Sequence, residues 1–211
     1  GLTLGLTWRN RTRLDLEQGA LTVNYEALEA GRIAYRDVRF TGVSIPQDVQ
    51  LGLLYAPAKS WLLSVEWNWI DWSRAIREFR VEAQDPERNP LPLLIPNEIV
   101  QLQAVELRDQ HAISLGVMHQ LDERTSLRAG YNYARQPVPG KNLTPLIAAI
   151  PEAHYALGVG RALSKTWSVD LGLFYNAPVS VRYANPNSPI TEDAREKHEA
   201  ISLLMTFSRN W

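Results

Sequence analysis

The chain has 211 residues, a formal net charge of −1 and no cysteine. This length fits one domain or part of one, and the lack of cysteine excludes disulfide bonds and thiolate metal sites. The balanced charge lacks the clustered Lys and Arg that nucleic-acid binding requires, so nucleic acid is not an expected partner. The apolar runs are far shorter than the roughly 20 residues of a membrane-spanning helix, so no helical span is expected.

Apolar and polar residues alternate along much of the chain, in segments of about ten residues, as β-strands with two different faces require. Near residue 65, for example, Trp61, Leu63 and Val65 share one face, and Ser64 and Glu66 lie on the other. The pattern predicts strands near residues 1–9, 49–55, 61–69, 113–117, 127–133, 155–159, 167–175 and 201–211. The predicted fold class is therefore all-β, an antiparallel meander of about eight strands.

The connections between these strands alternate in length. Those after Tyr55, at 121–125 and at 163–166 are short, whereas residues 15–48, 74–109, 136–152 and 177–198 form long loops. Tight turns at one rim and large loops at the other are typical of a transmembrane β-barrel. The first long loop is also expected to hold a short helix that begins at Asn24 and ends at Gly31.

The polar face of the predicted strands is rich in Gly, Ser, Thr and Asn, while Trp and Tyr collect near the strand ends. In an outer-membrane barrel the apolar face meets lipid, the small polar face lines the lumen and the aromatic residues form interfacial girdles. This arrangement favours a multi-pass β-barrel in the Gram-negative outer membrane over a soluble, lipocalin-like barrel. An eight-stranded barrel is just wide enough to be filled by side chains. These lumen residues look too small to fill it, so the chain is expected to form part of a wider barrel.

Several segments carry a family resemblance: residues 4–9 with 14–17, 67–73, 109–116, and 127–131 leading into Pro137-Val138-Pro139. In these segments the chain resembles the C-terminal part of the FadL-type outer-membrane transporters of long-chain fatty acids and aromatic hydrocarbons. The resemblance implies a fourteen-stranded barrel with an N-terminal hatch, which passes substrates sideways through a gap in its wall. Residues 1–211 would be the C-terminal part of this one barrel domain, without the hatch and about six early strands. Gating residues therefore cannot be assigned in this chain.

Candidate substrate contacts lie in the loops. Loop 136–152 is more apolar than an exposed loop should be, and it carries Leu143, Leu146, Ile147 and Ile150. It is either a landing site for a hydrophobic substrate or a segment that packs over its neighbours or into the lumen. Leu28, in the first long loop, has the same two interpretations: a substrate contact or part of a packed lid.

Charged side chains on the lumen face are the second candidate site. Glu66, Arg128 and Asp170 are all predicted to point into the lumen, where structural pairing is the favoured interpretation. Arg128 is alternatively suited to a fatty-acid carboxylate, because the guanidinium fork matches that group.

Two further features suggest partners. The last predicted strand carries Phe207 and ends at Trp211, which resembles the C-terminal signal that the barrel-assembly machinery recognises in outer-membrane proteins. Arg74, Arg77 and Arg80 follow a predicted strand at the loop rim. They either contact lipopolysaccharide phosphates among the outer-membrane lipids or are simply solvated.

The expected function is that of a wall segment in a transporter for passive uptake of hydrophobic molecules. The alternative is a small eight-stranded outer-membrane barrel with a structural or lipid-modifying enzyme role. Catalysis would need a nucleophile and a base in contact. The four histidines, His111, His119, His154 and His198, are scattered, and no Gly-x-Ser-x-Gly motif is present. We therefore expect no enzyme activity, no catalytic residues, no metal and no cofactor.

Overall fold

The computed structural model describes residues 1–145, 150–186 and 193–209. The chain divides into two compact units, which are described separately. Unit 1 comprises residues Gly1–Arg9, Asp48–Asp71 and Arg108–Trp211, and unit 2 comprises residues Asn10–Gln47 and Trp72–Leu107. No helix in the described part of the chain is both long and apolar enough to cross a lipid bilayer.

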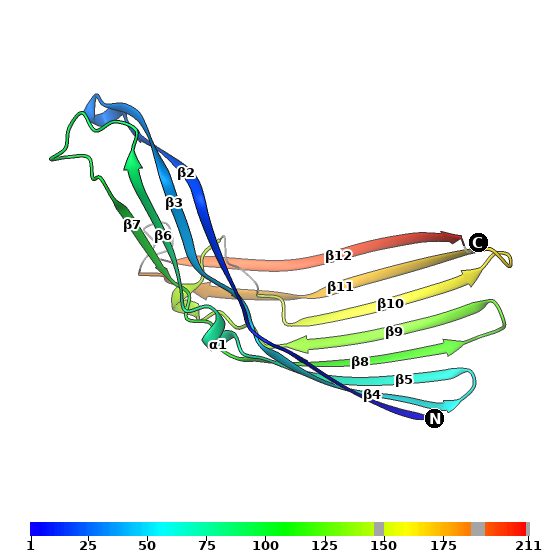
Figure 1. Ribbon diagram of the computed structural model, residues 1–211. Coiled ribbons are helices and arrows are strands. Elements are labelled where there is room, and N and C mark those ends of the chain that lie inside the picture. The colour runs from blue at the N-terminus through cyan, green and yellow to red at the C-terminus, as the bar shows by residue number, and fades with distance from the viewer. Residues whose placement is uncertain (146–149, 187–192, 210–211) are drawn as a thin grey trace. The chain divides into compact units, whose positions relative to one another are not determined.

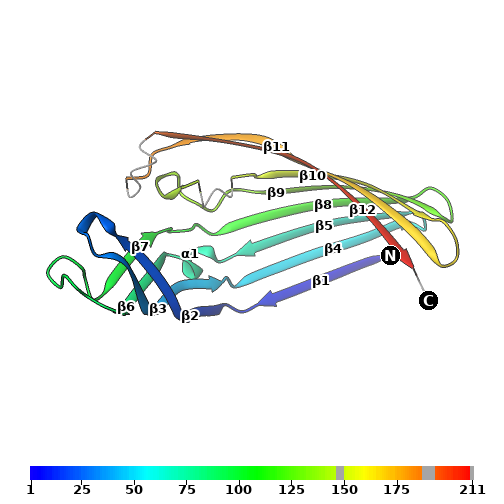
Figure 2. The same cartoon turned by 90° about the horizontal axis from the view of Figure 1, so that it is seen from above.

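Unit 1 is an antiparallel sheet of eight strands in the order β1-β4-β5-β8-β9-β10-β11-β12, which lie side by side in Figures 1 and 2. All eight predicted strands are confirmed. Within the described residues, β1 and β12 are the two edges, and neither pairs with the other. The strand bounds are β1 Leu2–Arg9, β4 Asp48–Ala58, β5 Trp61–Ile70, β8 Gln110–Gln120, β9 Thr125–Ala134, β10 Ala153–Ala162, β11 Trp167–Tyr183 and β12 Ala194–Arg209.

The register of unit 1 sorts the side chains onto two faces. Leu157 lies opposite Ala129 and Leu173, and the next residue, Gly158, lies opposite Arg128 and Gly172. Large apolar side chains on the first face are exposed on every strand of the sheet. The face that carries Leu157 is termed the lipid face, and the face that carries Gly158 is termed the lumen face.

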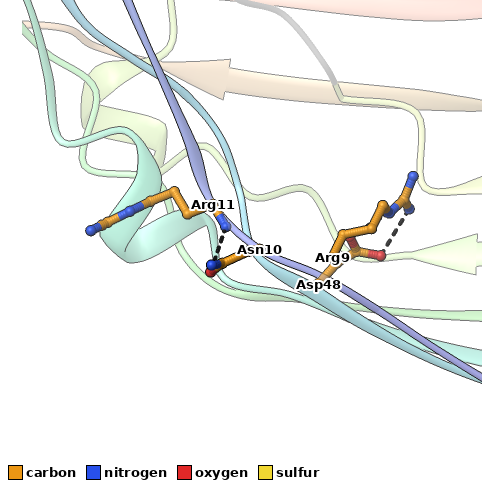
Figure 3. A network of polar contacts seen from close by, with 4 residues as sticks. All are labelled: Arg9, Asn10, Arg11 and Asp48. Atoms are coloured by element: carbon orange, nitrogen blue, oxygen red, sulfur yellow. Dashed lines mark hydrogen bonds and ion pairs between the residues drawn. The ribbon is translucent and has the colours of Figure 1, made fainter.

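An ion pair joins the ends of β1 and β4. Arg9 Nε donates to Asp48 Oδ1 at 2.7 Å and Arg9 Nη2 donates to Asp48 Oδ2 at 2.8 Å, as Figure 3 shows. The two residues are register partners, and the Asp48 carboxylate is buried. Both oxygens of this carboxylate are therefore satisfied by one fork, which fixes the register of β1 on β4.

The prediction of two long irregular loops is wrong, because these residues form the sheet of unit 2. Most of residues 15–48 and 74–109 form a four-stranded antiparallel sheet in the order β2-β3-β6-β7. The expected helix from Asn24 to Gly31 is only a three-residue 3₁₀ turn, because Glu29 has a left-handed backbone (φ 55°) and the chain then re-enters a strand. The bounds are β2 Thr12–Tyr25, η1 Glu26–Leu28, β3 Gly31–Ile45, α1 Trp72–Ala75, β6 Glu78–Pro86 and β7 Ile99–Ala104.

Unit 2 has its own hydrophobic core. Ile33, Tyr35, Ala83 and Ile95 are fully buried or nearly so. The Tyr35 hydroxyl donates to the carbonyl oxygen of Pro96 at 2.7 Å and lies 3.1 Å from the Tyr25 hydroxyl. Burial, followed by the contact with Tyr25, raises the pKa of Tyr35 to about 12. This buried, hydrogen-bonded phenol anchors the loop between β6 and β7 on the sheet.

The short connections of unit 1 are held by side-chain caps. In the β8–β9 turn, Asp122 Oδ1 accepts the backbone N–H groups of Arg124 at 2.7 Å and Thr125 at 2.9 Å. The Arg124 N–H is the main reason why the pKa of Asp122 lies below its usual value. Such Asx-type caps explain why this rim of the sheet needs only a few residues per turn.

Candidate functional site

An ion pair crosses the lumen face of unit 1 from β9 to β11. Arg128 Nη1 donates to Asp170 Oδ1 at 2.8 Å, and Arg128 Nη2 donates to Ser126 Oγ at 3.3 Å. Gly160, on the intervening strand β10, is the register partner of both Ser126 and Asp170. A Cβ atom at Gly160 would lie 2.6 Å from Asp170 Oδ1 and 3.1 Å from Arg128 Nη2. The missing side chain at this position therefore leaves room for the pair to span β10.

A hollow of about 320 Å³ lies beside this ion pair on the lumen face. Its floor is nearly free of side chains because glycine and alanine line up across neighbouring strands. The Phe174 ring lies against Gly172, where a Cβ atom would be 3.3 Å from Phe174 Cε2. The lining includes Arg128, Gly130, Ala156, Gly158, Asp170, Gly172, Phe174, Leu204 and Thr206.

The hollow is polar at one end and apolar at the other. Arg128 and Asp170 neutralise each other at the polar end, and Phe174 and Leu204 supply large apolar surfaces. An apolar cavity of about 150 Å³ is enough to hold benzene. The arrangement therefore suits a small neutral hydrophobic molecule, whereas a carboxylate would have to compete with Asp170 for Arg128.

A larger apolar groove of about 780 Å³ crosses the lipid face, and its lining includes Trp61, Leu127, Leu171 and Met205. Acyl chains cover this face in a bilayer. The smaller hollow on the lumen face is therefore the better candidate for a transported molecule.

The histidines do not form a hydrolase site in the described residues. His111 stacks on Trp67, and His119 stacks on Trp61 at 4.1 Å between ring centroids. His154 Nδ1 lies 2.7 Å from Asn176 Oδ1. In residues 1–145, 150–186 and 193–209, no hydrogen bond joins a histidine to a serine hydroxyl, and no group of three metal-ligating residues is found. These rings contact aromatic and amide groups instead.

A family model described as "Outer membrane protein transport protein (OMPP1/FadL/TodX)" matches residues 1–210. The chain belongs to this family. It is accordingly an outer-membrane β-barrel protein of a Gram-negative bacterium, in a family of transporters of hydrophobic compounds.

Solved structures of the OMPP1/FadL/TodX family share the fold. A "TodX deltaS2S3 mutant monoaromatic hydrocarbon channel" has a TM-score of 0.72 at 20% identity, and the match covers 100% of this chain and 46% of that chain. A Pseudomonas aeruginosa FadL homologue has a TM-score of 0.70 at 16% identity, with 98% and 49% covered. The Ralstonia pickettii toluene transporter TbuX has a TM-score of 0.59 at 14% identity, with 99% and 44% covered. No curated protein matched. The chain spans slightly less than half the length of these solved structures.

The three lumen charges expected to form one network are only partly brought together. Arg128 and Asp170 form the pair described above, but Glu66 lies on β5, opposite Gly52 on one side and Ser114 on the other. Among the described residues no ion pair to Glu66 is found. Because its register partners are neutral, Glu66 is separated from the Arg128–Asp170 pair on the lumen face of unit 1.

The described part of the apolar loop between β9 and β10 contains buried side chains. Leu143 and Ile150 are completely buried, next to the 3₁₀ turn η2 (Gly140–Asn142). Asn185 Nδ2 donates to the carbonyl oxygen of Leu143 at 3.1 Å. Leu146 and Ile147 lie outside the described residues. The burial of Leu143 and Ile150 is consistent with the packed interpretation for these two residues, and the substrate contact stays a prediction.

Leu28 lies in η1 of unit 2 and is 37% exposed. It is thus not a member of the buried core of unit 2. Leu28 belongs to unit 2, whereas Arg128 and the apolar loop belong to unit 1, and the substrate contact at Leu28 stays a prediction.

Phe174, Leu204 and the glycine floor were not predicted as site residues from the sequence. Phe174 and Leu204 occupy lumen-face positions, opposite Ala156 and Gly172 respectively. A large apolar residue at a position where the alternation calls for a polar one is the signal that could have identified them. The glycines become a floor only through the register of four strands, which the sequence does not display.

Proposed function

We propose that the chain forms part of the wall of an outer-membrane channel for passive uptake of hydrophobic molecules, either aromatic hydrocarbons or long-chain fatty acids. Residues 1–211 would be the C-terminal part of one barrel domain, with the short turns in the periplasm and the long loops outside. The observation that carries the proposal is an apolar, glycine-floored hollow on the lumen face of a sheet whose other face is suited to lipid. The chain is proposed to transport and not to catalyse.

The paired state of Arg128 supports a preference for neutral molecules at this hollow. Asp170 already occupies the guanidinium that a fatty-acid carboxylate would need. Breaking a half-exposed ion pair costs little, so a carboxylate is disfavoured here but not blocked. Asp170→Asn would release Arg128 and should raise uptake of a long-chain fatty acid relative to toluene.

The test is uptake of radiolabelled toluene and oleate by cells that lack their own hydrophobic-compound channel and express the full-length gene product. Ala156→Trp fills the hollow, and Leu173→Trp adds bulk on the lipid face at a residue that does not line the hollow. We expect Ala156→Trp to lower uptake severalfold and Leu173→Trp to leave it unchanged. Equal uptake in both variants, with both folded, would remove the hollow from the transport route.

The assembly partner is a separate part of the proposal. Phe207 lies on β12 and is 59% exposed, and Trp211 lies outside the described residues. We expect both aromatic residues to belong to the C-terminal signal read by the barrel-assembly machinery. The double variant Phe207→Ser/Trp211→Ser should reduce the amount of folded protein in the outer membrane, whereas Phe174→Ser should not.

A further inference from the structure

An extra residue in β11 divides the β11–β12 pair of unit 1 into two parts. The register runs without a break from Trp167 to Asn176 and resumes at Val179, so β11 has one residue more than β12 in between. The first part of β11, from Trp167 to Asn176, has the length of about 9–11 residues that a strand needs to cross a bilayer. A bulge of this kind turns the side chains that follow it to the other face of the strand.

The side of β12 that continues the lipid face changes from apolar to charged beyond the bulge. Ile201 and Leu203 are 67% and 84% exposed on this side. The unbroken alternation of β12 then places two cations on the same side, and their register partners on β11 are also polar. All four of these side chains are exposed, and they are termed the rim patch: Ser180, Arg182, Arg195 and Lys197.

Two of the three cations in the rim patch have no carboxylate partner. Arg182 Nε donates to Asp193 Oδ1 at 2.6 Å, and this contact holds the pKa of Asp193 below its usual value. Arg195 Nε donates to the neutral Ser180 Oγ at 3.0 Å. Within the described residues, neither Arg195 nor Lys197 forms an ion pair. The charge of Arg182 is therefore neutralised, whereas those of Arg195 and Lys197 are not.

One further carboxylate lies on this side of the sheet. Glu199 is two residues closer than Lys197 to the apolar part of β12, and its Oε1 lies 3.5 Å from the Tyr175 hydroxyl. When Glu199 is counted against Arg195 and Lys197, a surplus of one positive charge remains. This side of the β11–β12 pair therefore favours an anion.

A row of tyrosines indicates where the rim patch lies relative to the bilayer. Tyr131, Tyr155 and Tyr175 are register neighbours on three strands, with ring centroids 5.1 Å and 6.2 Å apart. Tyrosines collect at the membrane–water interface of outer-membrane barrels. Ile201 continues this row on β12, and Lys197 lies four residues further along, about 10 Å beyond the row for a tilted strand. The rim patch is thus expected at the level of the lipid headgroups.

The rim patch lies at the end of unit 1 that carries the long connections. The β8–β9 and β10–β11 turns are short and lie at the end of the sheet toward which β12 runs, as Figure 1 shows. The rim patch lies at the start of β12, which is the opposite end. In an outer-membrane barrel the long connections face outward. The headgroups beside the rim patch are therefore those of the outer leaflet.

We propose that Arg195 and Lys197 bind a phosphate group of lipopolysaccharide, the lipid of the outer leaflet. Basic side chains at a membrane surface attract anionic headgroups, and charge-assisted hydrogen bonds to phosphate are among the strong ones. The proposal rests on the outward orientation of the long connections in the proposed function, and it does not depend on what the channel transports. The contact expected at Arg74, Arg77 and Arg80 concerns unit 2 and stays a prediction.

The test titrates purified lipopolysaccharide against the full-length gene product in detergent, with binding read by native mass spectrometry. Arg195→Gln/Lys197→Gln removes the two cations without a carboxylate partner. The control, Arg161→Gln/Lys165→Gln, removes one exposed arginine and one exposed lysine near the short β10–β11 turn, at the opposite end of the sheet. We expect the first pair to weaken binding about tenfold or more, because one charge-assisted contact is worth about a tenfold step in affinity. The control pair should leave the affinity unchanged.

A third variant tests the sign of the charge at the rim patch. Glu199→Gln removes the carboxylate that opposes an anion on this side of the sheet, so it should strengthen the binding of lipopolysaccharide. Weaker binding in Glu199→Gln would contradict a bound anion.

Dephosphorylated lipopolysaccharide should bind the unaltered protein as weakly as intact lipopolysaccharide binds the Arg195→Gln/Lys197→Gln variant. Equal affinity for the two forms of lipid would overturn the proposal, as would equal effects of the two double variants. Displacement of the lipid by millimolar inorganic phosphate would also overturn it and assign the rim patch to a free anion. Toluene uptake should be normal in Arg195→Gln/Lys197→Gln, so a loss of lipid binding and a loss of transport are distinguishable. Boil-sensitive gel mobility confirms folding of each variant.

Discussion

The two sheets of the chain place their large apolar side chains in opposite ways. In unit 2, Ile33, Tyr35 and Ile95 are fully buried and the charged residues lie outside, as in a protein that folds in water. In unit 1, Leu157 and Leu203 are 59% and 84% exposed, and glycine and serine lie on the other face. Antiparallel strands in the two sheets are thus adapted to different solvents. In unit 1, the acyl chains of the membrane remove the apolar side chains from water, as the buried core does in unit 2.

The largest expected effect tests the core of unit 2. Ile33→Ala leaves a cavity in a fully buried site and should cost roughly 2–5 kcal/mol of local stability. Amide hydrogen exchange of residues 12–45 and 78–104 should accelerate, while the strands of unit 1 keep their protection. Protection lost equally in both sheets would show that the two sheets do not unfold independently.

A charged substitution should be costly on the lipid face of unit 1 and nearly neutral on the surface of unit 2. Leu157→Arg, near the middle of β10, should cost roughly 2–4 kcal/mol in lipid vesicles, because a charge there meets hydrocarbon. Leu102 lies on the edge strand β7 of unit 2 and is 55% exposed. Leu102→Arg should therefore change the free energy of unfolding by less than about 0.5 kcal/mol. Both values come from denaturant unfolding of the full-length gene product. Similar costs at the two sites would mean that Leu157 does not face lipid.

The phenol of Tyr35 gives unit 2 a stability that depends on pH. Its folded-state pKa of about 12 lies above the ordinary value of about 10, so folding favours the protonated phenol. This stabilisation is fully present below pH 10 and is lost as pH rises toward 12. Limited proteolysis of unit 2 should accelerate across that window. Tyr35→Phe should cost about 1 kcal/mol at neutral pH and flatten the alkaline response; an unchanged response in Tyr35→Phe would assign it to another group.

The smallest expected effect compares two glycines of the lumen face. Gly160→Ala would displace the Arg128–Asp170 pair, whereas a Cβ atom at Gly5 meets nothing within 4 Å. Since exposed ion pairs contribute little, Gly160→Ala should be less stable than Gly5→Ala by no more than about 1 kcal/mol. Unfolding in vesicles measures the difference, and a gap of zero would show that the pair contributes no stability.

How much the sequence predicts differs between the two sheets for a physical reason. In unit 1, lipid on one side and water on the other impose strict alternation, so all eight strands were predicted. The expected loop at 177–198 was wrong in its bounds, because β11 continues to Tyr183 and β12 begins at Ala194. In unit 2 the alternation is interrupted. The register of β2 on β3 shifts between Leu14 and Leu21, and Gln18 has a left-handed backbone (φ 61°). The strands of unit 2 were therefore interpreted as loops.

Part of the candidate site could likewise be predicted from the sequence, and part of it could not. That Arg128 and Asp170 share the lumen face follows from alternation within their own strands. That they touch across Gly160 depends on the register of β9, β10 and β11, which is a long-range property. Phe174 and Leu204 could have been identified from the sequence as exceptions to the alternation. Their position beside the same glycine floor could not be predicted from the sequence.

The most direct test of the account measures which solvent each face meets. The sequence has no cysteine, so single cysteines for spin labels can be placed at Tyr155, Ala156 and Leu157 of the full-length gene product in lipid vesicles. We expect the labels at 155 and 157 to collide with oxygen dissolved in lipid, and the label at 156 to collide with a water-soluble nickel complex. The same solvent at all three positions, or the reversed order, would contradict a barrel wall with its apolar face in lipid and its hollow in the lumen.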